Sequence, residues 1–435
     1  MLELRSRVFS GALWTLATFA SQNLLRLATN LVMARLLFPE AFGLMALVTV
    51  VIEGLGLFSD VGLRQSVIAN ARGDDPRFLH TVWSMQVARG GLIFAIAALL
   101  SLPVARFYGQ PELAGLIACT AVSSLFAGFT SMNIALLGRE LSLGKLSGFT
   151  LGTQAFVALL TLTLAWVHPT VWVLPLSSIL SRAILCGVSH LWLPGPRMRF
   201  AWDTSMRAEI LRFGRWIMVS SIFGYLINNL DRLALGTSMS MADLGAYSVA
   251  AMLARVVLQV ERRLNDEVLF PMMSRMGETS SSRSRAELVR ARLGLILLTH
   301  PVLIAMAVLG PELIGLLYDD RYAQAGWILQ VLAVGLLFKT SVEPAEQMLL
   351  ARGDSFRFMQ MLVMRSLIMS LALILAGYAF GPTGIVIAVA AGDLLAYPAL
   401  AWGVRRYGAW LPALELGSFA LSAGIVVAAL LAKGG

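Results

Sequence analysis

The sequence contains about thirteen apolar stretches, each long enough to cross a lipid bilayer as a helix. They fall near 10–36, 41–63, 81–103, 113–137, 147–167, 170–192, 211–236, 242–268, 289–310, 324–350, 358–379, 382–403 and 411–432. A spanning helix needs roughly 17–25 residues, and its backbone polar groups must be satisfied internally because hydrocarbon offers no hydrogen bonds. Strand-like alternation is absent from the sequence. We therefore predict an all-α polytopic membrane protein.

The composition supports this class. Hydrophobic types make up 58% of the 435 residues and charged types only 14%, whereas a soluble domain carries about 25% charged residues. So little charge excludes a soluble enzyme, a disordered chain and a fibrous protein. In a soluble protein the net charge of +9 would suggest nucleic acid. Here it indicates basic cytoplasmic loops beside anionic membrane lipid, and no nucleic-acid partner.

The loop charges predict an orientation. With the N-terminus in the cytoplasm, alternate loops on that side hold 21 basic residues, and the opposite side holds only Arg106, Arg321 and Lys433. Cytoplasmic loops of membrane proteins are enriched in Lys and Arg. We therefore expect a bacterial plasma-membrane protein with a cytoplasmic N-terminus. The long polar segment Met273–Arg292 is expected on the same side.

The two halves of the chain resemble each other. A shift of 202 residues places Trp14 over Trp216 and Gly43 over Gly245, and a shift of 213 places Arg139 over Arg352. Six spans separate the copies, so the repeat is parallel. This predicts two six-helix lobes, at 1–193 and 213–406, with a cytoplasmic linker at 194–212 and an extra helix at 407–435. Parallel-repeat transporters place the substrate site between their lobes, near the bilayer midplane.

Polar residues within the spans are the candidate site residues, because an ionisable group in a membrane usually faces a cavity or a partner. The first helix of each lobe carries a polar stripe, and the alternative is that these stripes pack helices together within a lobe. Arginines in a dry cleft bind phosphate or diphosphate through paired hydrogen bonds. The candidates for lining the cavity are Arg26, Asn30, Arg89, Asn228, Asp231, Arg232 and Arg255.

A second set of charges changes sign between the halves. At the 202-residue offset, Glu53 corresponds to Arg255, Asp60 to Arg262, and Arg64 to Asp266. Glu53, Asp60 and Arg64 are expected on one face of the second helix, and such opposite charges could latch the lobes in one conformation. The alternative is that those at the cytoplasmic boundary are solvated. Elsewhere, the simplest interpretation of Lys339 and Glu343 is an ion pair one helical turn apart.

Signatures of catalysis are missing from the sequence. The four histidines are scattered, no HExxH motif is present, and Gly144-Lys145 lacks the spacing of a phosphate-binding loop. The outer loops are too short to build an active site. We expect neither an enzyme nor a metal or cofactor, which leaves an H⁺ gradient, an Na⁺ gradient or the membrane potential as the source of energy.

Three segments resemble the bacterial oligosaccharide flippase (polysaccharide transporter) family. They are Ser10-Gly-Ala-Leu-Trp14, Ala34-Arg-Leu-Leu-Phe-Pro-Glu-Ala-Phe-Gly43 and Phe58-Ser-Asp-Val-Gly-Leu63, and Asn229-Leu-Asp-Arg232 resembles the opening of the family's second lobe. The resemblance implies the MATE-like fold of the multidrug and oligosaccharidyl-lipid exporter superfamily, with two six-helix lobes around a central cavity. It also implies a polyprenyl-diphosphate-linked oligosaccharide as substrate, exported for surface polysaccharide synthesis alongside a polymerase and glycosyltransferases.

Two other functions stay open at this point. A drug/cation antiporter of the same superfamily would favour acidic residues in its cavity, where arginines predominate here. A membrane-embedded polysaccharide-assembly enzyme would need carboxylates in a surface cleft. Family members often have 12 or 14 spans, so thirteen is a departure.

Overall fold

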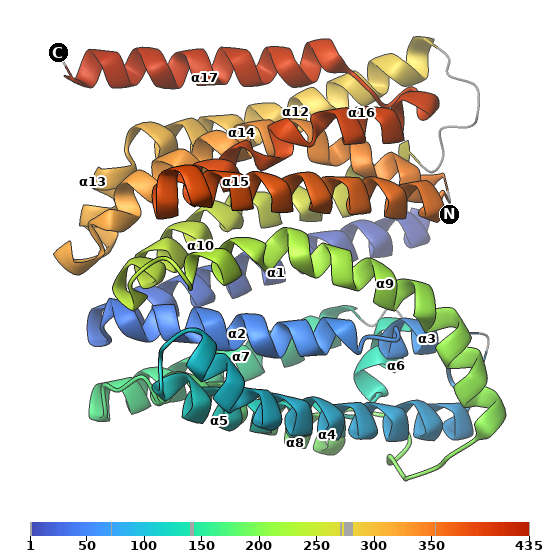
Figure 1. Ribbon diagram of the computed structural model, residues 1–435. Helices are drawn as coiled ribbons and strands as arrows, with labels where there is room; N and C mark the ends of the chain where they lie inside the picture. Colours follow the sequence, from blue (N-terminus) through green and yellow to red (C-terminus); the bar gives the residue numbers. More distant parts are fainter. Residues whose placement is uncertain are drawn as a thin grey trace. The chain divides into compact units, whose positions relative to one another are not determined.

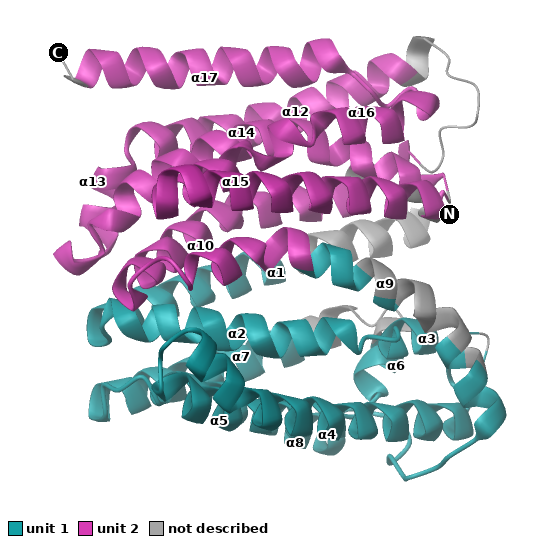
Figure 2. Cartoon of the chain, in the orientation of Figure 1, with its two compact units in different colours: residues 1–225 teal, residues 226–435 magenta. Residues whose placement is uncertain are grey.

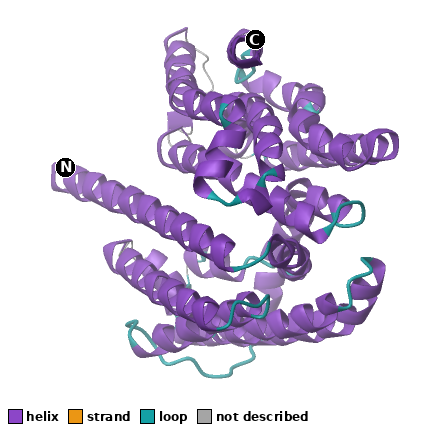
Figure 3. Ribbon diagram, turned by 90° about the vertical axis from the view of Figure 1, so that its left-hand side faces the viewer, coloured by secondary structure: helices purple, strands orange, loops and turns teal. Residues whose placement is uncertain are grey.

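A computed structural model describes residues 2–70, 72–139, 143–269, 272–273, 282–352 and 354–434, and these residues are helical with short connections (Figures 1 and 3). No strand occurs among them. The predicted all-α class is confirmed. Residues 274–281 of the predicted cytoplasmic loop 273–292 lie outside the described residues.

The chain forms two compact units, residues 1–225 and 226–435 (Figure 2). The division falls within a continuous helix, α9 (Thr204–Leu235). The predicted linker 194–212 therefore includes the start of α9 as well as non-helical residues before it. The other helices of the first unit are α1 (Leu2–Leu36), α2 (Pro39–Phe58), α3 (Leu63–Ala69), α4 (Pro76–Phe107), α5 (Glu112–Phe129), α6 (Asn133–Arg139), α7 (Leu143–Val167) and α8 (Val173–Leu191).

The second unit continues with α10 and ends with α17, the helix expected beyond the second lobe. Its elements are α10 (Met241–Leu264), the π-helix η1 (Asn265–Leu269), α12 (Ser282–Val308), α13 (Gly310–Leu317), the 3-10 helices η2 (Asp320–Tyr322) and η3 (Arg405–Tyr407), α14 (Gln324–Ala351), α15 (Ser355–Leu395), α16 (Tyr397–Val404) and α17 (Pro412–Gly434).

Ten segments of the described residues are long and apolar enough to span a membrane. One of them, Phe356–Tyr407, is 52 residues long and contains a break at Gly381, whose φ is +63°. Glycine adopts this left-handed conformation without a Cβ clash, and the following Pro382 cannot continue the preceding helix. The predicted spans 358–379 and 382–403 meet at this break. The polar α1 and α9 are not among the ten, although they cover two further predicted spans.

The predicted second span is too long. Helix α2 ends at Phe58, and Gly62, with φ +63°, precedes α3. The Asp60 carboxylate accepts a hydrogen bond from the Gly62 backbone N–H at 3.0 Å and stabilises this turn. The expectation that Glu53, Asp60 and Arg64 share one helical face is therefore wrong.

The corresponding helix of the second unit also loses its α-helical geometry. Helix α10 ends at Leu264, and the π-helix η1 carries Asp266. The predicted span 242–268 is therefore α-helical only as far as Leu264. Breaks thus occur at equivalent positions of the two halves, about 200 residues apart.

Close backbone contacts fix the helices that carry the polar residues. In the first unit, a Cβ on Gly90 of α4 would lie 2.6 Å from the Ser124 carbonyl oxygen of α5. In the second unit, a Cβ on Gly335 of α14 would lie 2.5 Å from the Ala390 carbonyl oxygen of α15. Small residues allow the two backbones to come this close. The resulting van der Waals packing stabilises helix pairs in lipid, where the hydrophobic effect does not drive helices together.

Candidate functional site

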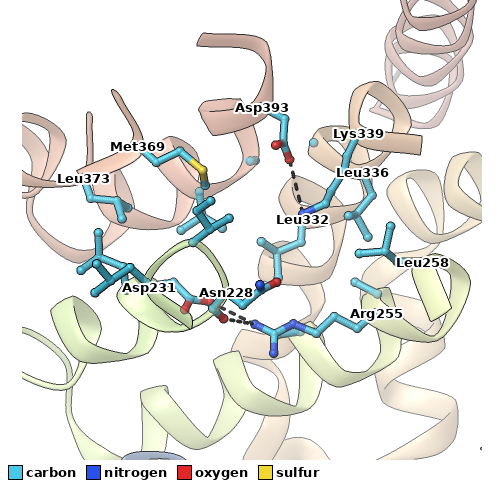
Figure 4. Close-up of a pocket in the computed structure, with 18 of the residues that line it drawn as sticks. Asn228, Asp231, Arg255, Leu258, Leu332, Leu336, Lys339, Met369, Leu373 and Asp393 are labelled. Carbon is cyan, nitrogen blue, oxygen red and sulfur yellow. Dashed lines mark hydrogen bonds and ion pairs between the residues drawn. The ribbon is translucent and has the colours of Figure 1, made fainter. Parts of the chain in front are cut away.

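A cavity of about 280 Å³ lies in the second unit, between α9, α10, α14 and α15 (Figure 4). Leucine and methionine side chains form much of its wall. Five charged residues interrupt this apolar wall, namely Asp231, Arg255, Arg262, Lys339 and Asp393. The cavity therefore combines an apolar lining with charges of both signs, held within a membrane-spanning unit.

Two helices present their polar residues to the cavity through helical periodicity. Asn228 and Asp231 are three residues apart on α9, and Arg255, Gln259 and Arg262 follow at intervals of four and three on α10. Positions at these spacings lie on one face of a helix. The predicted candidates Asn228, Asp231 and Arg255 are thus brought together. Arg232, the next residue of α9, does not line the cavity.

Asp231 lies at the centre of a buried polar cluster. Its Oδ2 accepts a hydrogen bond from the Tyr247 hydroxyl at 2.5 Å and forms an ion pair with Arg255 Nη2 at 3.3 Å (Figure 4). Arg255 also donates to the backbone carbonyl of Asn228 at 3.4 Å. The Asp231 side chain is 8% exposed and that of Arg255 is 34% exposed. Arg255 can therefore reach both its carboxylate partner and a molecule in the cavity.

The other two cavity cations also have acidic partners. Lys339 Nζ lies 3.7 Å from the Asp393 carboxylate (Figure 4), and Arg262 forms an ion pair with Glu343 of α14. The simple expectation of a Lys339–Glu343 pair is wrong. Arg262 of α10 and Asp393 of α15 are closer partners, because tertiary packing brings neighbouring helices against α14.

These pairings determine what the cavity can bind. A guanidinium group has donors in a planar fork that suits phosphate oxygens. Each cavity cation already has a carboxylate partner, so an anion entering the cavity must compete with that carboxylate. The described residues contain no group of three or more His, Cys, Asp or Glu side chains that could hold a metal ion. The arrangement suits anion binding by exchange of counter-ions.

The first-unit candidates on α1 have mixed surroundings. Arg26 is exposed and donates to the Asn23 side chain at 2.9 Å, and Asn30 donates to the Arg26 backbone carbonyl at 3.0 Å. One turn earlier, Gln22 donates to Thr150 of α7 at 3.1 Å. Part of the α1 stripe therefore packs helices within its unit, and Arg26 extends from a neighbouring position of the same helix.

Arg89 joins α4 to the end of α2. It donates to the Ser59 hydroxyl at 3.0 Å and to the Gly56 carbonyl, and its Nη1 lies 4.0 Å from the Asp60 carboxylate. The carbonyls at a helix C-terminus lack partners within the helix, so a cation stabilises them. These contacts support a structural role for Arg89 at the break between α2 and α3.

Two of the five predicted latch residues have ion-pair partners inside their own units. Asp60 pairs with Arg89, and Arg262 pairs with Glu343. Glu53 and Arg64 are exposed on α2 and α3, and Asp266 is exposed on η1. A direct Asp60–Arg262 pair stays a prediction.

Sequence reasoning missed a buried ion pair in the second unit. Arg292 falls in both the predicted cytoplasmic segment 273–292 and the predicted span 289–310. It lies on α12, is 1% exposed and pairs with Glu415 of α17 at 2.6 Å. Its other donors reach the backbone carbonyls of Ala409 and Ser341. The one available signal was Glu415, an acidic residue within an apolar stretch.

The described residues form two compact units, and ten of their helical segments are long and apolar enough to span a membrane, which defines a multi-pass membrane protein. Residues 32–327 match the sequence profile of a family described as polysaccharide biosynthesis protein. This match covers more than half of the chain. The protein belongs to this polysaccharide biosynthesis family.

Relatives of known sequence are named for polysaccharide biosynthesis. The chain is 25% identical over 432 residues to the lipopolysaccharide biosynthesis protein WzxC of Escherichia coli (strain K12), covering 94% of this chain and 86% of the relative. It is 23% identical over 317 residues to the succinoglycan biosynthesis transport protein ExoT of Rhizobium meliloti (strain 1021), covering 71% of this chain and 62% of the relative.

Solved structures share the fold. The lipid II flippase MurJ in an inward closed conformation matches with a TM-score of 0.75 and 12% identity, over 96% of this chain and 97% of that one. An inward-facing multidrug resistance MATE family transporter matches with a TM-score of 0.68 and 16% identity, over 89% and 95% of the chains. The predicted MATE-like fold is confirmed.

Proposed function

We propose that this protein carries a polyprenyl-diphosphate-linked oligosaccharide from the cytoplasmic to the outer face of the bacterial plasma membrane, by alternating access. The observation that carries this proposal is the family membership, together with relatives named for lipopolysaccharide and succinoglycan synthesis. The protein is a transporter and not an enzyme. The flipped glycan would serve the synthesis of lipopolysaccharide, capsule or exopolysaccharide.

The charges of the cavity support a diphosphate-bearing substrate. Moving an anion from water into the membrane interior costs many kcal/mol unless cations or hydrogen-bond donors replace the lost water. Arg255 and Arg262 supply such donors in the second unit. In the first unit, we propose that Arg26 supplies such donors. We propose that Asn30 and Asn228 form hydrogen bonds with the sugars. A drug/cation antiporter would favour acidic residues, whereas three cations and two carboxylates line this cavity.

Transport in proteoliposomes tests the proposal. The purified protein is reconstituted with a fluorescent undecaprenyl-diphosphate sugar, and an impermeant quencher reports which leaflet holds the label. We expect Arg26→Ala to slow translocation strongly and Arg26→Lys to slow it partly, because lysine keeps the charge but loses the forked donors. Arg106→Ala, which removes an exposed arginine at the end of α4, is the matched control. Wild-type flipping by Arg26→Ala would remove Arg26 from the site, and a wild-type protein that flips no such lipid would refute the function.

The orientation is proposed from the basic loop residues and is tested by cysteine labelling. In a background without Cys119 and Cys186, Asp74→Cys lies in a loop expected to be cytoplasmic, and Thr170→Cys lies in a loop expected outside. Both positions are exposed. An impermeant maleimide applied to intact spheroplasts should label Thr170→Cys and leave Asp74→Cys unlabelled. The reverse pattern would contradict the proposed orientation.

We also propose functional partners from the same pathway. A glycosyltransferase must complete the glycan on its lipid carrier before transport, and a polymerase or a ligase must use it afterwards on the outer face. Deletion of the gene should therefore leave complete lipid-linked repeat units in the cytoplasmic leaflet. Absence of that accumulation, with the glycosyltransferases active, would contradict this order.

A further inference from the structure

One buried carboxyl group in the second unit has no counter-ion or hydrogen bond among the described residues. Glu261 of α10 is 0% exposed, and neither of its side-chain oxygens has a hydrogen-bond partner there. An unpaired buried charge costs several kcal/mol, and buried polar groups normally have partners. The cavity does not explain this residue, because Glu261 does not line it.

The neighbouring ion pairs leave one negative charge uncompensated. Four cations and four carboxylates of the surrounding helices pair with one another: Arg262 with Glu343, Lys339 and Arg365 with Asp393 and Glu346, and Arg292 with Glu415. Every cation of this set is therefore engaged by another carboxylate. Glu261 is a fifth carboxyl group, and in its ionised form it adds a surplus charge of −1 to a membrane-embedded cluster.

A second unpartnered side chain lies one helical turn away. Asn265 is also 0% exposed, and its amide oxygen and nitrogen have no hydrogen-bond partner in the described part of the chain. Residues four apart share a helical face, so Glu261 and Asn265 are neighbours. Asn265 begins the π-helix η1, a rare geometry that is frequent at functional sites. Two independent anomalies therefore coincide.

We propose that Glu261 and Asn265 form a binding site for one monovalent cation, either a proton on the Glu261 carboxyl group or a sodium ion held by the side-chain oxygens. A single positive charge removes the surplus. The described residues lack the three or more ligating acidic, His or Cys side chains that a divalent metal site would require. The site depends on no assumption about the transported substrate.

The charged groups near the site come from α10 itself, η1, α12 and α14, and on α9, which also packs against α10, Asp231 pairs with Arg255. On α14 they are Lys339, Glu343 and Glu346, on α12 Arg292, on η1 Asp266 and Glu267, and on α10 itself Arg262 and Arg263. The Glu343 carboxylate interacts unfavourably with that of Glu261, and it pairs with Arg262, which lines the cavity. If the bound cation left, the ionised Glu261 carboxylate would attract Arg262 in competition with Glu343. Cation occupancy at Glu261 thereby acts on a residue of the cavity.

The thermal unfolding midpoint of the full-length protein in nanodiscs tests the site, because a ligand that binds only the folded state raises it. The protein is measured from pH 5.5 to 8.5, with NaCl replaced by choline chloride at constant ionic strength. A sodium site predicts a midpoint that rises with Na⁺ and one bound ²²Na⁺ per chain. A proton site predicts a midpoint that rises as the pH falls, without a response to Na⁺.

Glu261→Gln removes the charge and keeps the side-chain shape, so it should abolish whichever response the wild type shows. At pH 8.5 without sodium its midpoint should exceed that of the wild type. Glu267→Gln is the matched control, because it neutralises a half-buried carboxylate of η1 that already pairs with Arg263 at 2.8 Å. Should Glu261→Gln fail to fold, Asn265→Ala supplies a second test, since it should weaken a sodium response. A wild type indifferent to both ions, or a Glu261→Gln protein that keeps the response, would overturn the proposal.

Discussion

The ion pair between Asp231 and Arg255 makes a prediction about substrate affinity, because the carboxylate competes with an incoming phosphate for the same guanidinium group. Replacing Asp231 with Asn removes the competing charge. The amide oxygen can still accept the hydrogen bond from the Tyr247 hydroxyl, which lies 2.5 Å from Asp231 Oδ2. We therefore expect the variant to fold and to bind a diphosphate lipid more tightly than the wild type does.

The magnitude follows from the geometry. Two unit charges 3.3 Å apart interact by about 5 kcal/mol at an effective dielectric constant of about 20. Arg255 is 34% exposed, so solvent screens the pair and most of this gross energy is offset by desolvation. A net competition of about 1–2 kcal/mol corresponds to a change in Kd of roughly 5- to 30-fold.

The assay is equilibrium binding of a short-chain polyprenyl diphosphate to the purified full-length protein. Asp231→Asn should lower the Kd by that factor, and Arg255→Ala should raise it. Asp320→Asn changes the net charge equally at an exposed position of η2 and should leave the Kd unchanged. A folded Asp231→Asn protein with wild-type or weaker affinity would refute the idea that Asp231 competes with the substrate.

Two further predictions concern pairs of opposite charges. If Asp60 acts through its contact with Arg89, exchanging those two charges should restore the export that each single charge reversal loses. Exchanging the charges of Asp60 and Arg262 should restore export only if these two residues pair across the units, as the sequence suggests. Export complementation in a deletion strain distinguishes the two outcomes. Arg292→Met leaves the Glu415 carboxylate buried without its cation and should lower the free energy of unfolding by about 3–5 kcal/mol. Denaturant unfolding in mixed micelles measures this change. The double variant that also carries Glu415→Leu removes both charges and should recover much of the lost stability. Equal destabilisation by the single and double variants would contradict the account of the pair.

The comparison of prediction with structure is clearest at the helix breaks. Apolar stretches of about twenty residues indicated where helices would lie, but hydropathy does not register a change of backbone geometry within a stretch. Gly62, with a φ of +63°, lies in a break inside the predicted second span 41–63. The break at Gly381, also at +63°, falls at the predicted boundary between the spans 358–379 and 382–403. A glycine in an apolar run is common, so sequence position alone did not reveal that the helix would break before Gly62.

The sequence by itself determined the class of protein, because helix length and hydrophobicity are local properties that the bilayer enforces on each segment independently. It also identified Asn228, Asp231 and Arg255 as polar residues at helical spacing. Only the tertiary structure decided their partners. An ion pair depends on which helices pack against each other, and residues such as Arg292 and Glu415 are 123 positions apart in the chain. Lys339 and Glu343 are only four residues apart, yet they do not pair with each other. Each pairs with a residue of another helix, because helix packing brings those opposite charges closer.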